Sequence, residues 1–193
     1  FAKQVANKNY SGEYLSKDDN PFFIYGPSGV GKSHLLYAIS NKILENHPNA
    51  KISYITGEEF NNQILDAINV NKNTPAFREK YRTVDVLLID DIHFIAGKST
   101  VQEEFFNTFN YLHNDNKQII ISSDRSPDDL KVFEDRLKTR FCWGLTVNIF
   151  PPDFALRTEI IKKKIIAGNF EQEIPEDVIE YIASNINTDV RNL

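Results

Sequence analysis

The chain is poor in the residues that staple small secreted proteins and in the long apolar runs that span membranes. Its 193 residues include one cysteine, Cys142, and no methionine. A single cysteine excludes an internal disulfide framework and fits a reducing cytosol. No apolar run approaches the roughly 18 residues of a membrane helix, and no signal peptide is present. We therefore expect a cytoplasmic location.

The chain also lacks an excess of basic residues and any metal-ligand motif, and both absences exclude classes of function. The chain has 22 Lys and Arg against 27 Asp and Glu, a net charge of −5. It therefore lacks the basic surplus with which a domain grips duplex DNA by itself, and any DNA contact should be local or shared among several copies. The histidines, at positions 34, 47, 93 and 113, show no metal-ligand spacing and no Cys/His cluster accompanies them. We interpret them as structural or exposed.

The remaining composition is that of a soluble globular protein, with 41% hydrophobic and 25% charged residues. This length suits one domain of ordinary size, or a larger one followed by a much smaller one. Repeats and low-complexity segments are absent from the sequence. Because the chain lacks methionine and begins at Phe1 inside a helix-compatible run, we expect it to be a segment of a longer protein.

The most informative stretch is a glycine-rich loop at residues 26–33, Gly-Pro-Ser-Gly-Val-Gly-Lys-Ser, which follows an apolar run and opens a helical pattern. In such a phosphate-binding loop the glycines let backbone N–H groups curl around the phosphates, and Ser33 ligates Mg²⁺. Lys32 is expected to be an exposed point charge that reaches the β- and γ-phosphates. The nucleotide also lies at the positive end of the next helix. A chance match in an unrelated loop would lack the preceding strand and the following helix. The residues expected to bind ATP or ADP are Gly26, Gly29, Val30, Gly31, Lys32, Ser33 and His34.

Strand and helix patterns alternate along the chain, which predicts an α/β fold with a mostly parallel sheet flanked by helices. Strands are expected at 22–25, 52–55, 84–89, 118–122 and 145–149, and the strand at 52–55 should be short and buried. Two short helices, separated by a polar break at 69–75, are expected between 58 and 82. A double proline at 151–152 marks a boundary. We therefore expect a nucleotide-binding core over residues 1–150 and the start of a small, truncated helical lid over residues 151–193.

Two acids follow the third expected strand. Asp90 stands at the carboxyl end of a nearly continuous apolar run, where the second nucleotide motif of such ATPases places its Mg²⁺-organising carboxylate. The plainer interpretation is that two acids simply end a strand at the surface. Asp91 could polarise the attacking water as a general base. Since aspartate is shorter than the glutamate common in such ATPases, we expect slow turnover.

Polar and basic residues near the next two boundaries are further candidates. The segment 122–124, Ser-Ser-Asp, ends a strand at the same edge, where it could sense the γ-phosphate or form an ordinary loop. Arg136 and Arg140 are four residues apart and hence share a helix face. They could be ordinary solvent-exposed arginines on a helix surface, or one of them could reach the nucleotide of a neighbouring copy. Phe141 and Trp143 are expected to anchor the end of this helix in the core.

Taken together, these segments resemble the AAA+ ATPase domain of the bacterial replication initiator DnaA family, over essentially the whole chain. The resemblance is carried by residues 20–26, 81–92, 102–106, 122–125 and 134–145. It implies an AAA+ P-loop fold and a weak ATPase that works as a molecular switch. ATP-bound protomers would assemble on the chromosomal origin and promote duplex opening, and slow hydrolysis would reset them.

The resemblance also assigns residues. It implies that Asp124 is the sensor 1 residue, Arg140 the box VII arginine finger and Arg191 the sensor 2 arginine, all grouped with Asp90 and Asp91 as catalytic. The short helices at 58–82 resemble the initiator-specific insertion, which in this family steers filament geometry and single-strand binding. Thr100 stands where some relatives carry a basic residue near the pore, and Lys98 is the basic residue that remains.

The partners implied by the resemblance are other copies of the chain and origin DNA, single-stranded through this domain and duplex through a carboxy-terminal domain outside it. The replicative helicase, through regions outside this chain, and acidic phospholipids are implied as well. An AAA+ helicase loader or regulatory ATPase of replication is the main alternative, although the loader lacks the insertion pattern at 58–81. A small-molecule P-loop kinase is a second alternative, which would need a mobile lid and no arginine from a neighbour.

Overall fold

The computed structural model describes residues 19–70, 72–168, 174–186 and 189–193. Its centre is a five-stranded sheet with the strand order β2-β3-β4-β1-β5, in which every pairing is parallel. All strands therefore end at one edge of the sheet, as the alternating sequence pattern predicts. The strands are β1 (Phe22–Tyr25), β2 (Ile52–Thr56), β3 (Val86–Asp90), β4 (Gln118–Ser123) and β5 (Leu145–Asn148).

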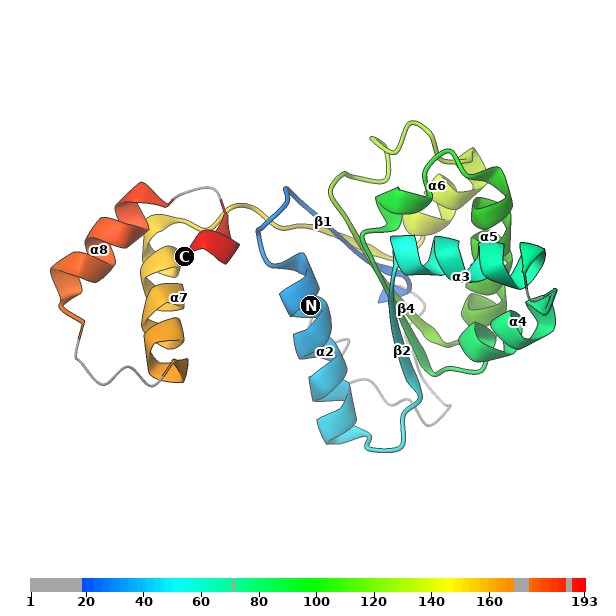
Figure 1. Ribbon diagram of the computed structural model, residues 1–193, viewed down its shortest axis with the longest axis horizontal. Coiled ribbons are helices and arrows are strands. Elements are labelled where there is room, and N and C mark those ends of the chain that lie inside the picture. Colours follow the sequence, from blue (N-terminus) through cyan, green and yellow to red (C-terminus); the bar gives the residue numbers. More distant parts are fainter. Residues whose placement is uncertain (1–18, 71, 169–173, 187–188) are drawn as a thin grey trace.

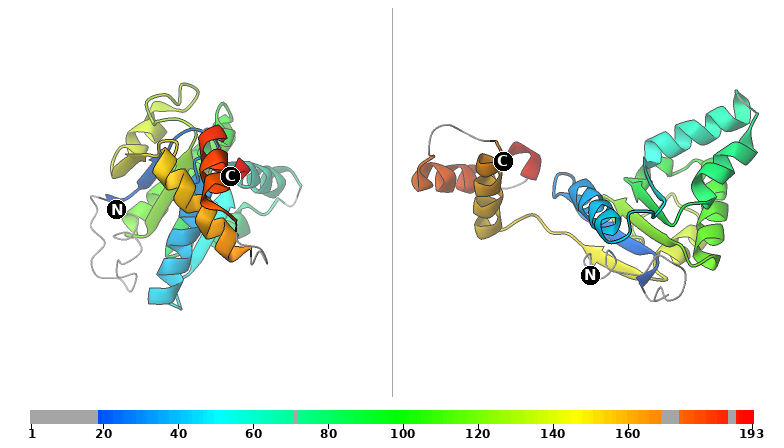
Figure 2. Two further views of the ribbon diagram at one scale, coloured as in Figure 1. Left: turned by 90° about the vertical axis from the view of Figure 1, so that its left-hand side faces the viewer. Right: turned by 90° about the horizontal axis from the view of Figure 1, so that it is seen from below.

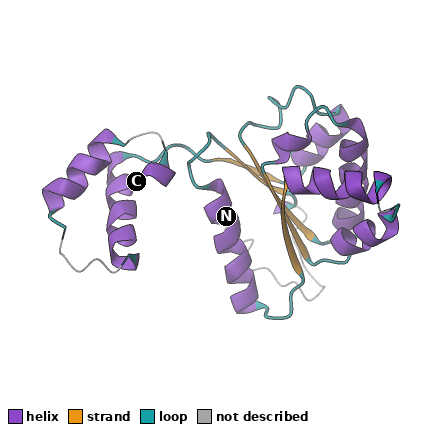
Figure 3. Cartoon of the chain, viewed as in Figure 1, coloured by secondary structure: helices purple, strands orange, loops and turns teal. Residues whose placement is uncertain are grey.

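Helices cover both faces of the sheet (Figure 1, Figure 3). One face packs on α2 (Lys32–Asn46), and the other on α3 (Gly57–Asn69), α4 (Thr74–Arg82), α5 (Ser99–Asn114) and α6 (Asp135–Phe141). Successive strand residues point to opposite faces, so Phe22 and Ile24 lie in the α2 layer and Phe23 in the other. Because helices cover both faces of the sheet, its central strands are buried on both sides and are almost entirely apolar.

The third and second strands differ in burial. All five residues of β3 are buried, including Asp90 at 3% exposure, as expected for a central strand. We expected a buried strand at 52–55 as well, but β2 lies at the edge of the sheet and only Ile55 in it is buried. Edge position explains the difference, because β2 has a neighbouring strand on one side only.

The two short helices expected at 58–82 are α3 and α4. A capping box at Thr56 and Glu59 starts α3, in which the Thr56 hydroxyl accepts from the Glu59 N–H and the Glu59 carboxylate from the Thr56 N–H. Phe60 packs edge-on against Phe77 and Phe105. The α4 helix begins at Thr74 with a proline in its first turn, so the polar break at 69–75 is shorter than the sequence suggested.

A buried carboxylate fixes α4 to α5. The Glu104 side chain is 8% exposed and accepts two hydrogen bonds from Arg78, at 3.0 and 2.8 Å, and one from Arg82 at 2.7 Å. A bidentate arginine pair with a desolvated carboxylate is among the stronger polar contacts in proteins, and removing one partner would leave a buried charge. The pair of short helices is therefore held firmly on the core.

The carboxy-terminal part is helical and is joined to β5 by residues 149–153. It consists of α7 (Phe154–Ala167), α8 (Glu176–Asn185) and a short 3₁₀ turn, η3 (Val190–Asn192). Its own small apolar cluster contains Ile161, Ile179 and Ala183. Figure 2 shows these helices to one side of the sheet and its covering helices. None of the described helices is long and apolar enough to cross a membrane.

Candidate functional site

The glycine-rich loop connects β1 to α2 at the carboxyl edge of the sheet. Gly29 and Gly31 have φ angles of 80° and 100°, in the left-handed region where other residues are strained. Gly31 is also the N-cap of α2, and no side chain in the described residues caps this helix. The first backbone N–H groups of α2 are therefore available to an anion at the positive end of the helix.

Lys32 lies inside this loop. Its side chain is buried, at 7% exposure, and its ammonium donates to the Gly26 carbonyl at 2.9 Å and to the Pro27 carbonyl at 3.0 Å. Both acceptors belong to the loop itself, so the charge is held within the ring of backbone that would surround a phosphate. Ser33 is half-buried beside it and His34 is exposed on the first turn of α2.

Asp90 is held by hydrogen bonds from two other strands. Its Oδ2 accepts from the Tyr54 hydroxyl of β2 at 2.7 Å, and its Oδ1 accepts from the Ser122 hydroxyl of β4. The Ser122 hydroxyl also accepts the Asp91 N–H at 2.9 Å. Burial and the Asp90 carboxylate raise the pKa of Tyr54 well above its usual value. These contacts keep Asp90 an acceptor with a fixed orientation. Nothing in the sequence pattern pointed to Tyr54.

Asp91 and Asp124 face a shared imidazole. His93 Nδ1 lies 3.3 Å from Asp124 Oδ1 and 4.0 Å from Asp91 Oδ1. Asp91 has a left-handed φ of 52°, which turns it out of the strand, and burial followed by the neighbouring Asp90 charge raises the pKa of its carboxyl. We interpreted His93 as structural or exposed from sequence. The structure instead brings it between two acids at the edge of the sheet, which no residue spacing could reveal.

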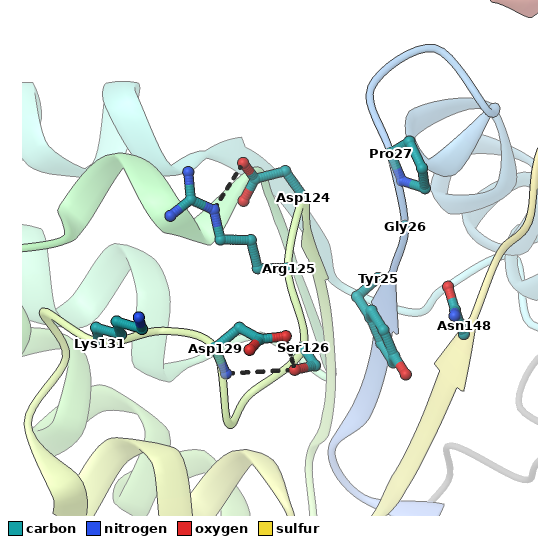
Figure 4. A pocket seen from close by; sticks show the side chains of 9 residues that line it. All are labelled: Tyr25, Gly26, Pro27, Asp124, Arg125, Ser126, Asp129, Lys131 and Asn148. Carbon is teal, nitrogen blue, oxygen red and sulfur yellow. Dashed lines mark hydrogen bonds and ion pairs between the residues drawn. The ribbon is translucent and has the colours of Figure 1, made fainter. Parts of the chain in front are cut away.

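A pocket of about 510 Å³ opens beside the loop, between the ends of β1, β4 and β5 (Figure 4). Its walls include Gly26 and Pro27 of the loop, Asp124 after β4, and Asn148 at the end of β5. Arg125 donates to the Asp124 carboxylate at 3.3 Å from this wall. In open parallel sheets, ligands bind outside the carboxyl ends of the strands, and this pocket lies there.

The carboxy-terminal turn contacts the loop from the other side. Arg191 of η3 donates to the Ser28 hydroxyl at 2.7 Å, and the Val190 N–H donates to the Gly29 carbonyl at 3.0 Å. Asp189 orients Arg191 by accepting from its Nε at 3.2 Å. A side chain at position 29 would collide with Asp189, so this glycine serves the close approach of the turn as well as the φ angle. Arg191 thus lies at the phosphate-binding loop of its own chain.

The family model of the bacterial DnaA ATPase domain matches residues 1–148. The chain belongs to this family. Domain III of the replication initiation protein DnaA from Thermotoga maritima is 42% identical, with a TM-score of 0.89 over 98% of this chain and 75% of that one. AMPPCP-bound DnaA from Aquifex aeolicus is 36% identical, with a TM-score of 0.85 over 99% of this chain and 56% of that one.

A third structure, replication initiator DnaA bound to AMPPCP and single-stranded DNA, is 36% identical with a TM-score of 0.83, over 98% of this chain and 56% of that one. This chain therefore spans little more than half the length of two of these DnaA structures. The expected family, AAA+ fold and helical carboxy-terminal part are confirmed, and the family is one of ATPase domains. A structure of DnaI, 19% identical with a TM-score of 0.60, shares only the fold, so the helicase-loader alternative is not favoured.

The residue predicted as the arginine finger of this DnaA domain lies apart from the loop. Arg140 is on α6, and its contacts are with Asn110 and Phe106 of α5 and with Trp143. Arg136 shares its face, over the Phe106 ring at 4.4 Å. Phe141 is fully buried, as predicted, but Trp143 is 45% exposed. The expectation that Trp143 anchors the helix in the core was wrong, because its ring stacks on the Arg140 guanidinium instead.

Lys98 and Thr100 lie at the start of α5, where both are exposed. They follow the 3₁₀ turn η2 (Ile92–Ile95) along the chain. Their part in DNA binding stays a prediction.

Replacing Asp90 with asparagine should weaken the Mg²⁺-dependent part of nucleotide binding or turnover, since a neutral amide cannot organise the metal through a charged oxygen. Fluorescent-nucleotide titrations at several Mg²⁺ concentrations would measure this, with Asp85→Asn as the control. Asp85 precedes the same strand at its other end and pairs with Lys117 at 3.0 Å. Equal affinity and turnover for Asp90→Asn and parent at every Mg²⁺ concentration would remove Asp90 from this role.

Proposed function

We propose that this chain is the ATP-controlled assembly module of a chromosomal replication initiator. ATP bound at the loop of one protomer is bridged by Arg140 of the next, the resulting filament engages and opens origin DNA, and slow hydrolysis resets it. Membership of the DnaA ATPase family supports the activity and the process. The solved relatives bound to AMPPCP, and in one case to single-stranded DNA, support the ligands.

Nucleotide binding would use the loop and the first turn of α2. Lys32 would pair with the β- and γ-phosphates and Arg191 would sense the nucleotide from the lid of the same protomer. Asp91 would orient the attacking water. Asp124, which follows β4 and lies beside His93, would sense the γ-phosphate. The short reach of Asp91 suits a slow hydrolysis that works as a timer.

The donor set fits Mg²⁺. Among the described residues no group of three or more His, Cys, Asp or Glu could hold a metal by itself. A hydroxyl from Ser33 and an oriented carboxylate from Asp90 are what Mg²⁺ uses when phosphates and waters complete its shell. When bound, the ion would neutralise charge that develops on the β- and γ-phosphate oxygens.

One observation carries the assembly proposal: the predicted finger is remote from its own loop. Arg140 contacts α5 and the segment after α6, and in the described residues it has no contact with the loop or with Asp90, Asp91 or Asp124. An arginine that serves γ-phosphate chemistry from such a position must act on another protomer. Arg191, by contrast, lies at the loop of its own chain.

The wider role is proposed for the whole protein. It would act in the cytoplasm, read duplex origin DNA through a carboxy-terminal domain, and engage the replicative helicase and acidic phospholipids, all on the strength of family resemblance. We also propose that the boundary between core and lid lies near residue 150, which the separate apolar cluster of α7 and α8 supports.

DNA binding by the 193-residue chain tests this function. Because the net charge is −5, we expect duplex DNA to bind non-specifically, with a Kd of about 10⁻⁴ M or weaker at physiological salt. Single-stranded DNA should bind more tightly with ATP than with ADP, since several aligned copies are needed to supply enough basic groups. Fluorescence anisotropy with both nucleotides would measure this. A tight, sequence-specific complex of one protomer with duplex DNA would contradict the proposal.

A further inference from the structure

The guanidinium of Arg140 is held by two side chains of its own protomer, Asn110 and Trp143. Its Nε donates to the Asn110 Oδ1 at 2.9 Å, and its central carbon lies 3.6 Å from the centre of a Trp143 ring. Phe106 lies further away, at 5.6 Å from its ring centre. One edge and one face of the guanidinium are therefore occupied by the protomer to which it belongs.

The two terminal nitrogens of Arg140 remain. In the described residues neither has a hydrogen-bond partner, and the residue is only partly buried. These nitrogens form the planar fork that grips a phosphate through two parallel hydrogen bonds. Stacking on an indole fixes the plane of the fork, and the Asn110 contact fixes its rotation in that plane. A side chain held in this way loses less conformational freedom when it binds.

Trp143 lies at the surface with its ring against the Arg140 guanidinium. It is 45% exposed, whereas Phe141, two residues earlier, is fully buried and already anchors α6. The ring of His113 from α5 lies 5.0 Å from the Trp143 ring, so the indole is itself supported. An exposed tryptophan with one face on an arginine is a cation–π platform and not core packing.

We infer that Trp143 and Asn110 are positioning residues that hold Arg140 ready for the nucleotide phosphate of a second copy of this chain. The inference rests on the proposed function, because it assumes that Arg140 acts in assembly. It goes beyond that function by naming the residues that set the geometry of the finger. Among the described residues, the contacts of Trp143 and Asn110 are with Arg140 and His113 and not with the loop of their own protomer.

The test is ATP-dependent assembly of the whole protein, measured by sedimentation over a range of protein concentrations. Trp143→Leu should raise the concentration at half-assembly by roughly five- to thirtyfold, the range that corresponds to losing one cation–π contact at a partly desolvated site. ATP affinity per protomer and the thermal midpoint should stay near those of the parent. Trp143→Phe should restore most of the assembly, since it keeps an aromatic face, and Asn110→Ala should act like Trp143→Leu.

Two controls separate positioning from general surface effects. Tyr111 is 51% exposed on α5 and lies 5.7 Å below Arg82, which stays fixed by Glu104 when the ring is lost. Tyr111→Leu should therefore leave assembly unchanged. If Trp143 acts through Arg140, Trp143→Leu should add nothing to Arg140→Ala, because the two changes then remove one interaction.

The outcomes are distinct. If Arg140→Ala still assembles like the parent, the proposed function fails. If Arg140→Ala loses assembly but Trp143→Leu and Asn110→Ala keep it, the positioning inference alone is overturned. The inference is also overturned if Trp143→Leu lowers ATP affinity and the thermal midpoint together with assembly, or if Trp143→Phe fails to restore it, because Trp143 would then be a structural residue.

Discussion

Lys32→Ala is expected to abolish detectable ATP binding while the fold persists. The ammonium is the charge that the loop directs at the β- and γ-phosphates, and removing one partner of a buried, hydrogen-bonded charge pair typically costs about 2–5 kcal/mol of binding free energy. Titration with a fluorescent ATP analogue would measure the loss. Circular dichroism would show whether the sheet and helices remain.

Burial of Lys32 sharpens the design of this experiment. We expected an exposed point charge, but the side chain is 7% exposed and bonds two loop carbonyls. Alanine therefore also frees these carbonyls, which a modest change in thermal midpoint would reveal. Lys42→Ala is the matched control, because Lys42 lies on the same helix, is half-exposed and pairs with Glu45 at 2.8 Å. If Lys32→Ala binds ATP as the parent does, the loop is not a nucleotide site.

Much of the fold could be predicted because each element carries a local signal. The apolar run that becomes β3 requires burial on both faces, and the proline after α2 ends that helix at Asn46. The sequence-based predictions failed where the burial of an element depends on which other elements pack against it. The sequence of β2 looks as buried as that of β3, but its place at the edge of the sheet depends on the pairing of all five strands.

The candidate site divides in the same way. Residues in the loop and at the strand ends could be predicted because motif spacing and parallel strands bring them to one edge. Tyr54 and His93 could not, since each reaches the acids from another strand or from a turn whose course depends on a left-handed residue, Asp91. The prediction that Trp143 is buried was wrong for a related reason. An aromatic residue after a helix usually packs inward, and only the fold shows that the Arg140 guanidinium lies against its ring.

Arg140→Ala is expected to keep near-normal ATP binding per protomer but to lose ATP-dependent oligomers. In the described residues the Arg140 side chain has no contact with the loop of its own protomer, so each protomer should still bind ATP. An arginine supplied in trans can change the rate by about 10³–10⁵ where hydrolysis is fast. In a slow switch we expect the same contact to appear chiefly as assembly. Lys138→Ala is the matched control, a cation of the same helix that pairs with Asp135 at 2.6 Å.

Arg191→Ala should behave in the opposite way, and the contrast makes the experiment decisive. Arg191 touches Ser28 at 2.7 Å within its own chain, so its loss should alter hydrolysis or the response to ATP in dilute protein, where no neighbour is present. Arg140→Ala should be silent under those conditions. Sedimentation of the whole protein with ATP then decides the role of Arg140. Filaments like those of the parent would show that Arg140 is a solvated surface residue, since a finger that bridges two protomers cannot be removed without separating them.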